Sequence, residues 1–209
     1  MLVKLYSDSP NVREINKIVK VLNDGGIIVI PTDTLYAFAC SMEFKKAAEN
    51  IAQLKGMQLK KAKYSLCCAD LSQASEYIRP LDKDTFSVMK ECLPGPYTFI
   101  LQANNNVPRN YQNANKTIGI RVPQHPICHA IIETLGQPLI VSSVRRENME
   151  QESEYLTDPE LIHEDFGKRV DIVVDGGIGE DLPSTVIDCS EDGFEIIREG
   201  KGQIPSSLQ

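Results

Sequence analysis

A short apolar run between a glycine pair and a proline constrains the fold more than any other feature of this chain. The run Ile27–Ile30 is too short for a helix and has no polar face, so it predicts a strand buried on both sides. Pro31 cannot donate to a sheet ladder, and the strand is therefore expected to end there. The residues that follow, Thr32–Tyr36, carry hydroxyl groups and a carboxylate. Because open α/β sheets bind ligands beyond the carboxyl ends of their strands, these residues are a candidate binding segment.

This segment, called the threonine loop below, also has a simpler interpretation. Its hydroxyl groups would then only cap a helix that begins near Ser41 or Glu43. The first interpretation predicts a ligand site and the second predicts a helix start. Local composition leaves both open.

The length and composition of the chain limit the classes of protein to consider. A chain of 209 residues can bury a sizeable core as one domain, residues 1–209. Its apolar runs are far shorter than the roughly 18 residues of a membrane span, and Met1–Pro10 lacks the apolar region of a secretory signal. The six cysteines form no CxxC pair, as expected of reduced thiols. These features predict a cytoplasmic protein.

The charge is unevenly distributed along the chain. The net charge of −7 argues against a dedicated nucleic-acid-binding protein. Basic residues nevertheless gather in one segment, at Lys45, Lys46, Lys55, Lys60, Lys61 and Lys63. A local group of cations on an acidic protein suits a small polyanion such as ATP better than a long duplex.

The remaining sequence alternates helical patterns with buried strands. Asn11 is suited to cap a first helix that ends at Gly25. Further helices are expected at 43–54, after Asp70, at 82–92, at 126–135 and after Asp158. Strands are expected at 2–6, 27–30, 64–68, 97–102, 117–122, 139–143 and 170–174, with a hairpin of 184–189 and 194–198. This alternation predicts an α/β (α+β) domain with three layers and a mixed β-sheet.

Six short motifs occur in a characteristic order. They are PTDTLYAFA at 31–39, PGPYT at 94–98, IRVP at 120–123, SS at 142–143, STVID at 184–188 and REG at 198–200. In this order they resemble the YrdC-like family of threonylcarbamoyl-AMP synthases, over about residues 11–202. The segments PGPYTFIL and KTIGIRVP, with the loss of a second serine after Ser143, resemble the YciO branch of that family.

The resemblance implies a fold and a reaction. The implied fold is a three-layer YrdC-like one, with a twisted mixed β-sheet around a large cavity. The implied reaction is that of a nucleotidyltransferase, which converts L-threonine, bicarbonate and ATP to threonylcarbamoyl-AMP and pyrophosphate for the t6A modification of tRNA. Mg²⁺ is implied as a cofactor that accompanies ATP, and no residue is assigned as a metal ligand. The sequence has no GxxxxGK[ST] or GxGxxG motif, so discrete Lys and Arg side chains would have to bind the phosphates.

The resemblance also implies roles for residues at matched positions. The substrate-binding residues are Thr32, Thr34, Tyr36, Thr117, Arg121 and Ser184. The nucleotide-binding residues are Lys55, Lys61, Ser142, Ser143 and Arg198, and Lys55 is also the implied catalytic residue. Arg121 would pair with the substrate carboxylate, for which a guanidinium fork is geometrically apt. Considered alone, Arg121 or Arg198 would be interpreted as a surface cation on a strand.

The sequence departs from the family at the catalytic pattern K-x-R and S-x-N. Lys55 is present, but Met57 stands in place of the arginine. Val144 replaces the second serine and Arg146 replaces the asparagine. The departures predict a synthase of reduced or redirected activity. The alternative is a YciO-like protein that binds nucleotide, double-stranded RNA or tRNA without efficient synthase activity.

Two further groupings invite a metal or redox interpretation. His125, Cys128 and His129 fall within about one helical turn, but Pro126 places His125 at a helix start, where a cap or surface role is the better interpretation. Cys67 and Cys68 are adjacent in a predicted strand, so their side chains should face opposite sides of the sheet.

Overall fold

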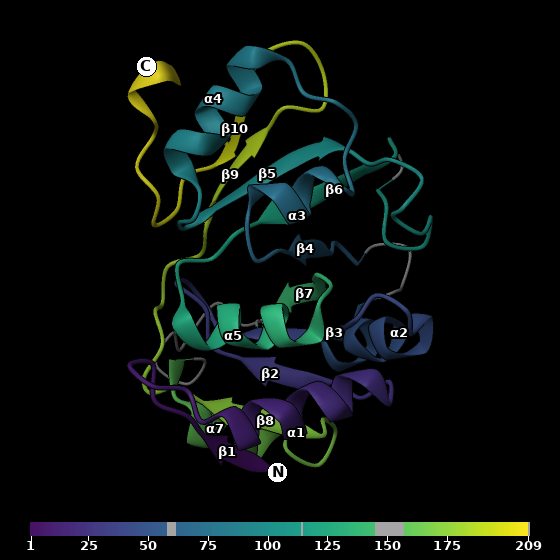
Figure 1. The fold of residues 1–209 in the computed structure, drawn as a ribbon, viewed down its shortest axis with the longest axis vertical. Coiled ribbons are helices and arrows are strands. Elements are labelled where there is room, and N and C mark those ends of the chain that lie inside the picture. Colours follow the sequence, from purple (N-terminus) through teal and green to yellow (C-terminus); the bar gives the residue numbers. More distant parts are fainter. Residues whose placement is uncertain (58–61, 114, 145–156, 209) are drawn as a thin grey trace.

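A mixed sheet forms the centre of the fold. The computed structural model describes residues 1–57, 62–113, 115–144 and 157–208. Within those residues the sheet has ten strands in the order β1-β8-β2-β3-β7-β4-β6-β5-β9-β10. The strands are β1 Leu2–Lys4, β2 Ile28–Ile30, β3 Ala37–Ser41, β4 Ser65–Cys67, β5 Tyr97–Gln102, β6 Thr117–Arg121, β7 Leu139–Ser143, β8 Ile172–Asp175, β9 Thr185–Asp188 and β10 Glu195–Arg198. Figure 1 shows β1 and β8 at one end of the molecule and the β9–β10 hairpin at the other.

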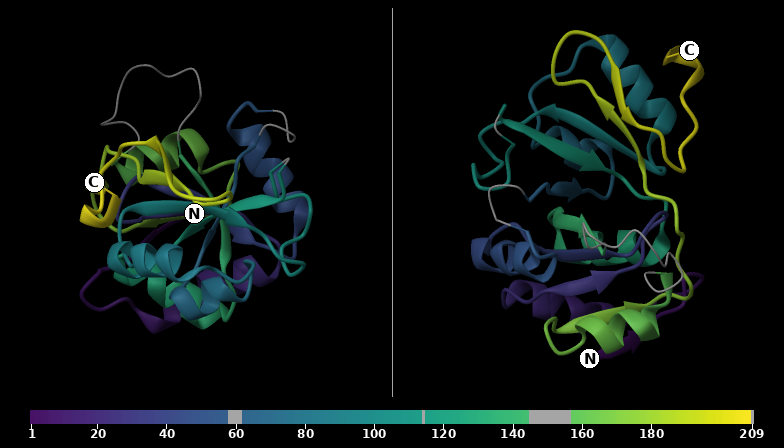
Figure 2. Two further views of the ribbon diagram at one scale, coloured as in Figure 1. Left: turned by 90° about the horizontal axis from the view of Figure 1, so that it is seen from above. Right: turned by 180° about the vertical axis from the view of Figure 1, so that it is seen from behind.

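Helices pack on both faces of this sheet. They are α1 Val12–Asn23, α2 Lys45–Leu54, α3 Leu71–Ser75, α4 Lys83–Cys92, α5 Pro126–Leu135 and α7 Pro159–Phe166, with a short 3₁₀ helix η2 at Ser206–Leu208. The buried side chains of α1 and α5 belong to one core cluster, and those of the other α-helices belong to a second. Alternate residues of β2 belong to different clusters, so the clusters lie on opposite faces of the sheet. The two further views in Figure 2 show the strong twist of the sheet between its ends.

Local signals account for most of the element boundaries. The Asn11 side chain accepts hydrogen bonds from the amides of Arg13 and Glu14 and so caps α1. Pro126 opens α5, and Gly136 ends it in the left-handed conformation, with φ of 75°. Cys67 and Cys68 belong to opposite core clusters, which confirms their predicted alternation. No helix among the described residues is long and apolar enough to cross a membrane.

The segment after the threonine loop differs from the prediction. Residues Ala37–Ser41 form strand β3, which pairs antiparallel with β2. The threonine loop therefore joins two neighbouring antiparallel strands and does not lead from a strand to a helix. Helix α2 begins at Lys45, and its N-cap residue Phe44 makes no side-chain cap hydrogen bond, so the helix-cap interpretation is wrong as well. Every residue of β3 is buried, so the strand shows no polar alternation that could have identified it.

The C-terminal segment after β10 is tied back onto the start of β9. The amide of Gly200 donates to the Thr185 hydroxyl over 2.9 Å, and the amide of Lys201 donates to the carbonyl of Pro183 over 2.8 Å. A Cβ at Gly200 would collide with the backbone of Pro183 and Ser184. This close approach is a packing reason for glycine there.

We expect Gly200→Ala to lower the free energy of unfolding by about 1–3 kcal/mol, because the atoms that the new methyl group meets are backbone atoms that cannot rotate away. Urea denaturation followed by circular dichroism measures the change. The control is Glu199→Ala, an exposed neighbour whose truncation should cost little. Equal stabilities of the two variants would show that the segment can shift to accept a side chain.

Candidate functional site

A pocket of about 470 Å³ opens beside the threonine loop. It is called the front pocket here, and its lining includes Thr34, Lys55, Arg121, Ser142, Ser184 and Arg198. Its floor comes from β4, β5, β6, β7 and β9, including Ser65 and Gly119, which are register partners. Ser65 lies two residues from Cys67, so the floor is on the sheet face that α1 and α5 cover elsewhere. A Cβ at Gly119 would lie 2.5 Å from the Ser65 hydroxyl, so glycine leaves this part of the floor open.

Most of the sequence-predicted site residues meet in this pocket. Seven of them line it: Thr34, Lys55, Arg121, Ser142, Ser143, Ser184 and Arg198. Three others, Thr32, Tyr36 and Thr117, are buried but are absent from its lining. Lys61 lies outside the described residues, as does Arg146. Segments that are far apart in the sequence therefore converge on one site.

Thr32 and Tyr36 support the threonine loop from behind and do not share the wall of the front pocket. The Thr32 hydroxyl donates to the carbonyl of Leu35 and accepts from the amide of Thr34, which closes the turn that presents Thr34. The Tyr36 hydroxyl donates to the carbonyl of Gly177 over 2.6 Å and accepts from the amide of Gly176. Burial raises the pKa of Tyr36 well above its ordinary value, so this hydroxyl stays a hydrogen-bond donor.

Arg121 is bound within the protein and is not a surface cation. Its Nη2 lies 2.8 Å from Asp33 Oδ1 and 2.9 Å from the Thr34 hydroxyl. The side chains of Arg121 and Asp33 are 10% and 8% exposed. The second Asp33 oxygen accepts from the amide of Gln124 over 3.0 Å. Sequence reasoning missed this role of Asp33, although it is the only acidic residue in the threonine loop.

Further hydroxyls and cations line the front pocket. The hydroxyls of Ser184 and Thr98 are 2.8 Å apart, and Arg198 donates to the carbonyl of Ser184 through Nε and Nη2. Lys55, directly after α2, donates to the Ser142 hydroxyl over 2.7 Å. Thr98 also lines the pocket, and the sequence did not predict it. A threonine on a strand carries no local signal of function, and Thr98 meets Ser184 only because β5 and β9 pair in the folded sheet.

Thr117 and Val144 do not line the front pocket themselves. Thr117 accepts a hydrogen bond from Asn113 Nδ2, and Asn113 is the residue of this pair that lines the pocket. The side chain of Val144 is 1% exposed and belongs to the hydrophobic core. Met57, by contrast, lines the pocket. Of the departures from the family pattern among the described residues, Met57 is therefore the one that a ligand would contact.

The charge of the front pocket has one sign. Its described lining contains four cationic side chains, Lys55, Lys63, Arg121 and Arg198, and no carboxylate. The nearby acid Asp33 is already paired with Arg121. Because the whole chain carries a net charge of −7, this pocket is a local reversal of charge that attracts anions.

The described residues show neither a metal-binding group of side chains nor a cysteine in the front pocket. They contain no group of three or more His, Cys, Asp or Glu side chains that could hold a metal ion. The six cysteines are free, and none of them lines the front pocket. Burial raises the pKa of Cys40 to about 12, and desolvation likewise raises that of Cys68, so these thiols stay protonated.

The Arg121–Asp33 pair yields a prediction for stability. We expect Asp33→Ala to lower the free energy of unfolding by about 3 kcal/mol, because it leaves a buried guanidinium without its counter-ion. Asp33→Ala combined with Arg121→Met should cost less than the sum of the single changes, since the double variant buries no lone charge. Urea denaturation gives all three values.

The control is Asp24→Ala, which removes an ion pair with Lys20 whose side chains are 63% and 74% exposed. Exposed pairs contribute little, so this change should leave stability nearly unaltered. An Asp33→Ala variant as stable as Asp24→Ala would contradict the importance of the buried pair.

Comparisons with known proteins identify the family of this chain. Residues 20–200 match the Sua5/YciO/YrdC family, described as "Telomere recombination". The chain is 40% identical over 207 residues to the Escherichia coli K12 protein YciO, which is described as uncharacterized. The matched residues are 98% of this chain and 97% of YciO. The crystal structure of E. coli YciO superposes with a TM-score of 0.92 at 37% identity, covering 100% of this chain and 99% of that chain.

Synthases are more distant relatives. The threonylcarbamoyl-AMP synthase of Nitrosococcus oceani is 31% identical over 161 residues, which are 77% of this chain and 84% of the synthase. The structure of P. abyssi Sua5 complexed with L-threonine has a TM-score of 0.86 at 22% identity, covers 96% of this chain and 57% of that chain, and supports the fold alone. The YrdC-like resemblance predicted from the motifs is thus confirmed, and the chain belongs to the Sua5/YciO/YrdC family.

Proposed function

We propose that the front pocket binds ATP together with an amino acid, and that the protein is a threonylcarbamoyl-AMP synthase-like enzyme of reduced activity. The observation that carries this proposal is the one-signed charge of the pocket, with four cationic side chains and no carboxylate in its described lining. Phosphates are the ligands that such a site attracts. A volume of about 470 Å³ lies within the range of small-molecule pockets.

The relatives supply the amino-acid part of the proposal. The N. oceani relative is named a threonylcarbamoyl-AMP synthase, and the P. abyssi Sua5 structure carries L-threonine. In the present chain, Thr34 and Arg121 lie together in the front pocket. Within the described residues, Nε of Arg121 is buried and makes no hydrogen bond. We assign this donor to the carboxylate of the bound amino acid.

The residues of the pocket would act mainly by position and charge. In the proposed reaction the amino group of L-threonine adds to bicarbonate, and water leaves. An oxygen of the resulting carbamate then attacks the α-phosphorus of ATP while the bond to the β-phosphate breaks and pyrophosphate departs. Lys55, Lys63 and Arg198 would stabilise the negative charge on the phosphates during this step.

Mg²⁺ would enter this site with the nucleotide. Mg²⁺ in proteins is bound through carboxylates and substrate phosphates, and the described lining of the front pocket contains no carboxylate. The pocket residues therefore do not form a protein-held Mg²⁺ site. The phosphates of ATP would supply the ligands, and the protein would contribute the surrounding cations.

A nucleotide-binding protein without efficient turnover is the second candidate, and Met57 favours it. A thioether cannot donate the hydrogen bonds that a guanidinium offers to phosphates. Binding to double-stranded RNA or tRNA would use the same cations through backbone contacts. Titration calorimetry with ATP, L-threonine and duplex RNA at two salt concentrations separates the candidates. A steep salt dependence with RNA and no response to L-threonine would favour RNA binding.

Lys55→Ala should weaken ATP binding by about 1–3 kcal/mol, the range for a hydrogen bond to a charged group. Titration calorimetry measures the affinity. The matched control is Lys46→Ala, an exposed lysine on α2, which should do much less. Equal and small effects would mean that Lys55 does not contact the bound ATP.

Met57→Arg should speed threonine-dependent pyrophosphate release by on the order of 10², because it returns a charge-stabilising donor to the pocket wall beside Lys55. The control is Met57→Leu, which keeps the size and apolar character of the side chain and should leave the rate unchanged. A folded Met57→Arg protein that still binds ATP but gains no rate would argue for another amino acid substrate or for binding without turnover.

A further inference from the structure

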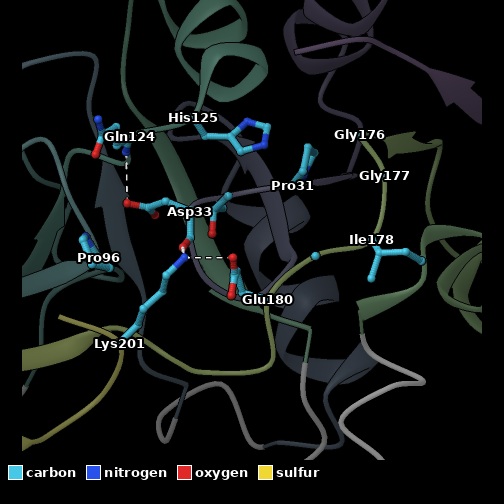
Figure 3. A pocket seen from close by; sticks show the side chains of 12 residues that line it. Pro31, Asp33, Pro96, Gln124, His125, Gly176, Gly177, Ile178, Glu180 and Lys201 are labelled. Carbon is cyan, nitrogen blue, oxygen red and sulfur yellow. Dashed lines mark hydrogen bonds and ion pairs between the residues drawn. The ribbon is translucent and has the colours of Figure 1, made fainter. Parts of the chain in front are cut away.

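A second pocket lies behind the threonine loop. It is called the back pocket here, has a volume of about 330 Å³, and is lined by residues that include Thr32, Asp33, His125, Gly177, Glu180 and Lys201 (Figure 3). The turn Thr32–Thr34 separates it from the front pocket, since Thr32 lines one pocket and Thr34 the other. Pro31, Thr32 and Asp33 of the motif at 31–39 line this pocket, and the proposed reaction does not use it.

An ion pair stands at the wall of the back pocket. Lys201 Nζ lies 3.0 Å from Glu180 Oε1 and donates to the carbonyl of Asp33 over 2.9 Å. Figure 3 shows both side chains reaching toward Asp33 from different segments. Their side chains are 34% and 50% exposed, so the pair contributes little to stability and can open at small cost.

The other charged groups of the pocket are already satisfied or neutral. The Asp33 carboxylate is shared between Arg121 and the amide of Gln124. Burial lowers the pKa of His125, so its imidazole is uncharged at neutral pH. Lys201 and Glu180 are therefore the charges that a ligand in this pocket would meet, one of each sign.

Paired charges of opposite sign favour a ligand that carries both. A phosphate or other simple anion would be repelled by Glu180, and a simple cation would be repelled by Lys201. A zwitterion that inserts between the two side chains replaces one ion pair with two. Gly177 lines the pocket, and a Cβ at that position would meet no atom within 4 Å, so this part of the wall leaves room for a compact ligand.

We propose that the back pocket is a binding site for a free α-amino acid, with the ligand carboxylate on Lys201 and its ammonium group on Glu180. This site goes beyond the proposed function, because it is separate from the front pocket and needs no nucleotide. An amino acid bound there would contact the threonine loop from the side opposite to the proposed substrate.

Isoleucine methyl groups can report on the two pockets separately. Ile178 lines the back pocket and is 72% exposed, whereas Ile100 lines the front pocket. We expect L-threonine, added without ATP to protein with ¹³C-labelled isoleucine methyl groups, to shift the Ile178 signal saturably. N-acetyl-L-threonine lacks the ammonium group and L-threonine amide lacks the carboxylate, so each should bind about tenfold more weakly.

Variants at the ion pair test the assignment. Glu180→Gln and Lys201→Met should each weaken the Ile178 response by about tenfold, because each removes one charged partner of the zwitterion. Glu195→Gln changes an exposed glutamate on β10 and should leave the response intact. Within the described residues, the Glu180 side chain has Lys201 as its one hydrogen-bond or ion-pair partner, so Glu180→Gln should leave folding unaffected.

The outcomes separate this proposal from the proposed function. An unmoved Ile178 signal, or equal responses to L-threonine and its two blocked analogues, would overturn the back-pocket site. An Ile178 response that survives both ion-pair variants would overturn it as well. Failure of ATP to shift Ile100 would count against the nucleotide site of the front pocket and would leave the back-pocket result untouched.

Discussion

The ion pair between Arg121 and Asp33 is the interaction on which the rest of the site depends. It joins the end of β6 to the threonine loop over 2.8 Å, between side chains that are about nine-tenths buried. Burying two charged groups is costly unless further hydrogen bonds satisfy their remaining donors and acceptors. Here the Thr34 hydroxyl and the amide of Gln124 supply such bonds. The pair therefore fixes Thr34 toward the front pocket and forms the partition between the two pockets.

This partition also sets the charge on each side. Asp33 neutralises much of Arg121, and the other cations in the described lining of the front pocket are Lys55, Lys63 and Arg198. On the other side, the carbonyl of Asp33 holds Lys201 in place, and Lys201 is matched by Glu180. One loop thus has an anion-attracting pocket in front of it and a charge-balanced pocket behind it.

The sequence predicts the elements that carry their own local signals. Strands β5 and β7 and helix α5 have the expected bounds, because their signals act within a few residues: alternation in β5, a short buried apolar run in β7, and Pro126 and Gly136 around α5. Strand β3 was missed because it is buried throughout and follows a loop that suggests a helix start. The pairing of Asp33 with Arg121 was missed for a different reason, since the partners are 88 residues apart and meet only through the sheet. Thr32 and Tyr36 belong to the motif at 31–39, but their side chains hold the threonine loop in place and do not line the front pocket. The motif does not reveal this difference, because it depends on the direction in which each side chain points.

The same distinction decides which departure from the family pattern can affect chemistry. The Val144 side chain packs in the core, while its amide donates to the carbonyl of Tyr36 over 2.8 Å and so helps to hold the threonine loop. A serine at that position would add a hydroxyl to apolar surroundings, where it would need a partner to avoid a desolvation cost. Met57 lies on the pocket wall with Lys55, where an arginine would face the ligand. Among the described residues, Met57 is therefore the one to which the proposed loss of synthase rate should be traced. The backbone around Val144 is part of the support of the loop.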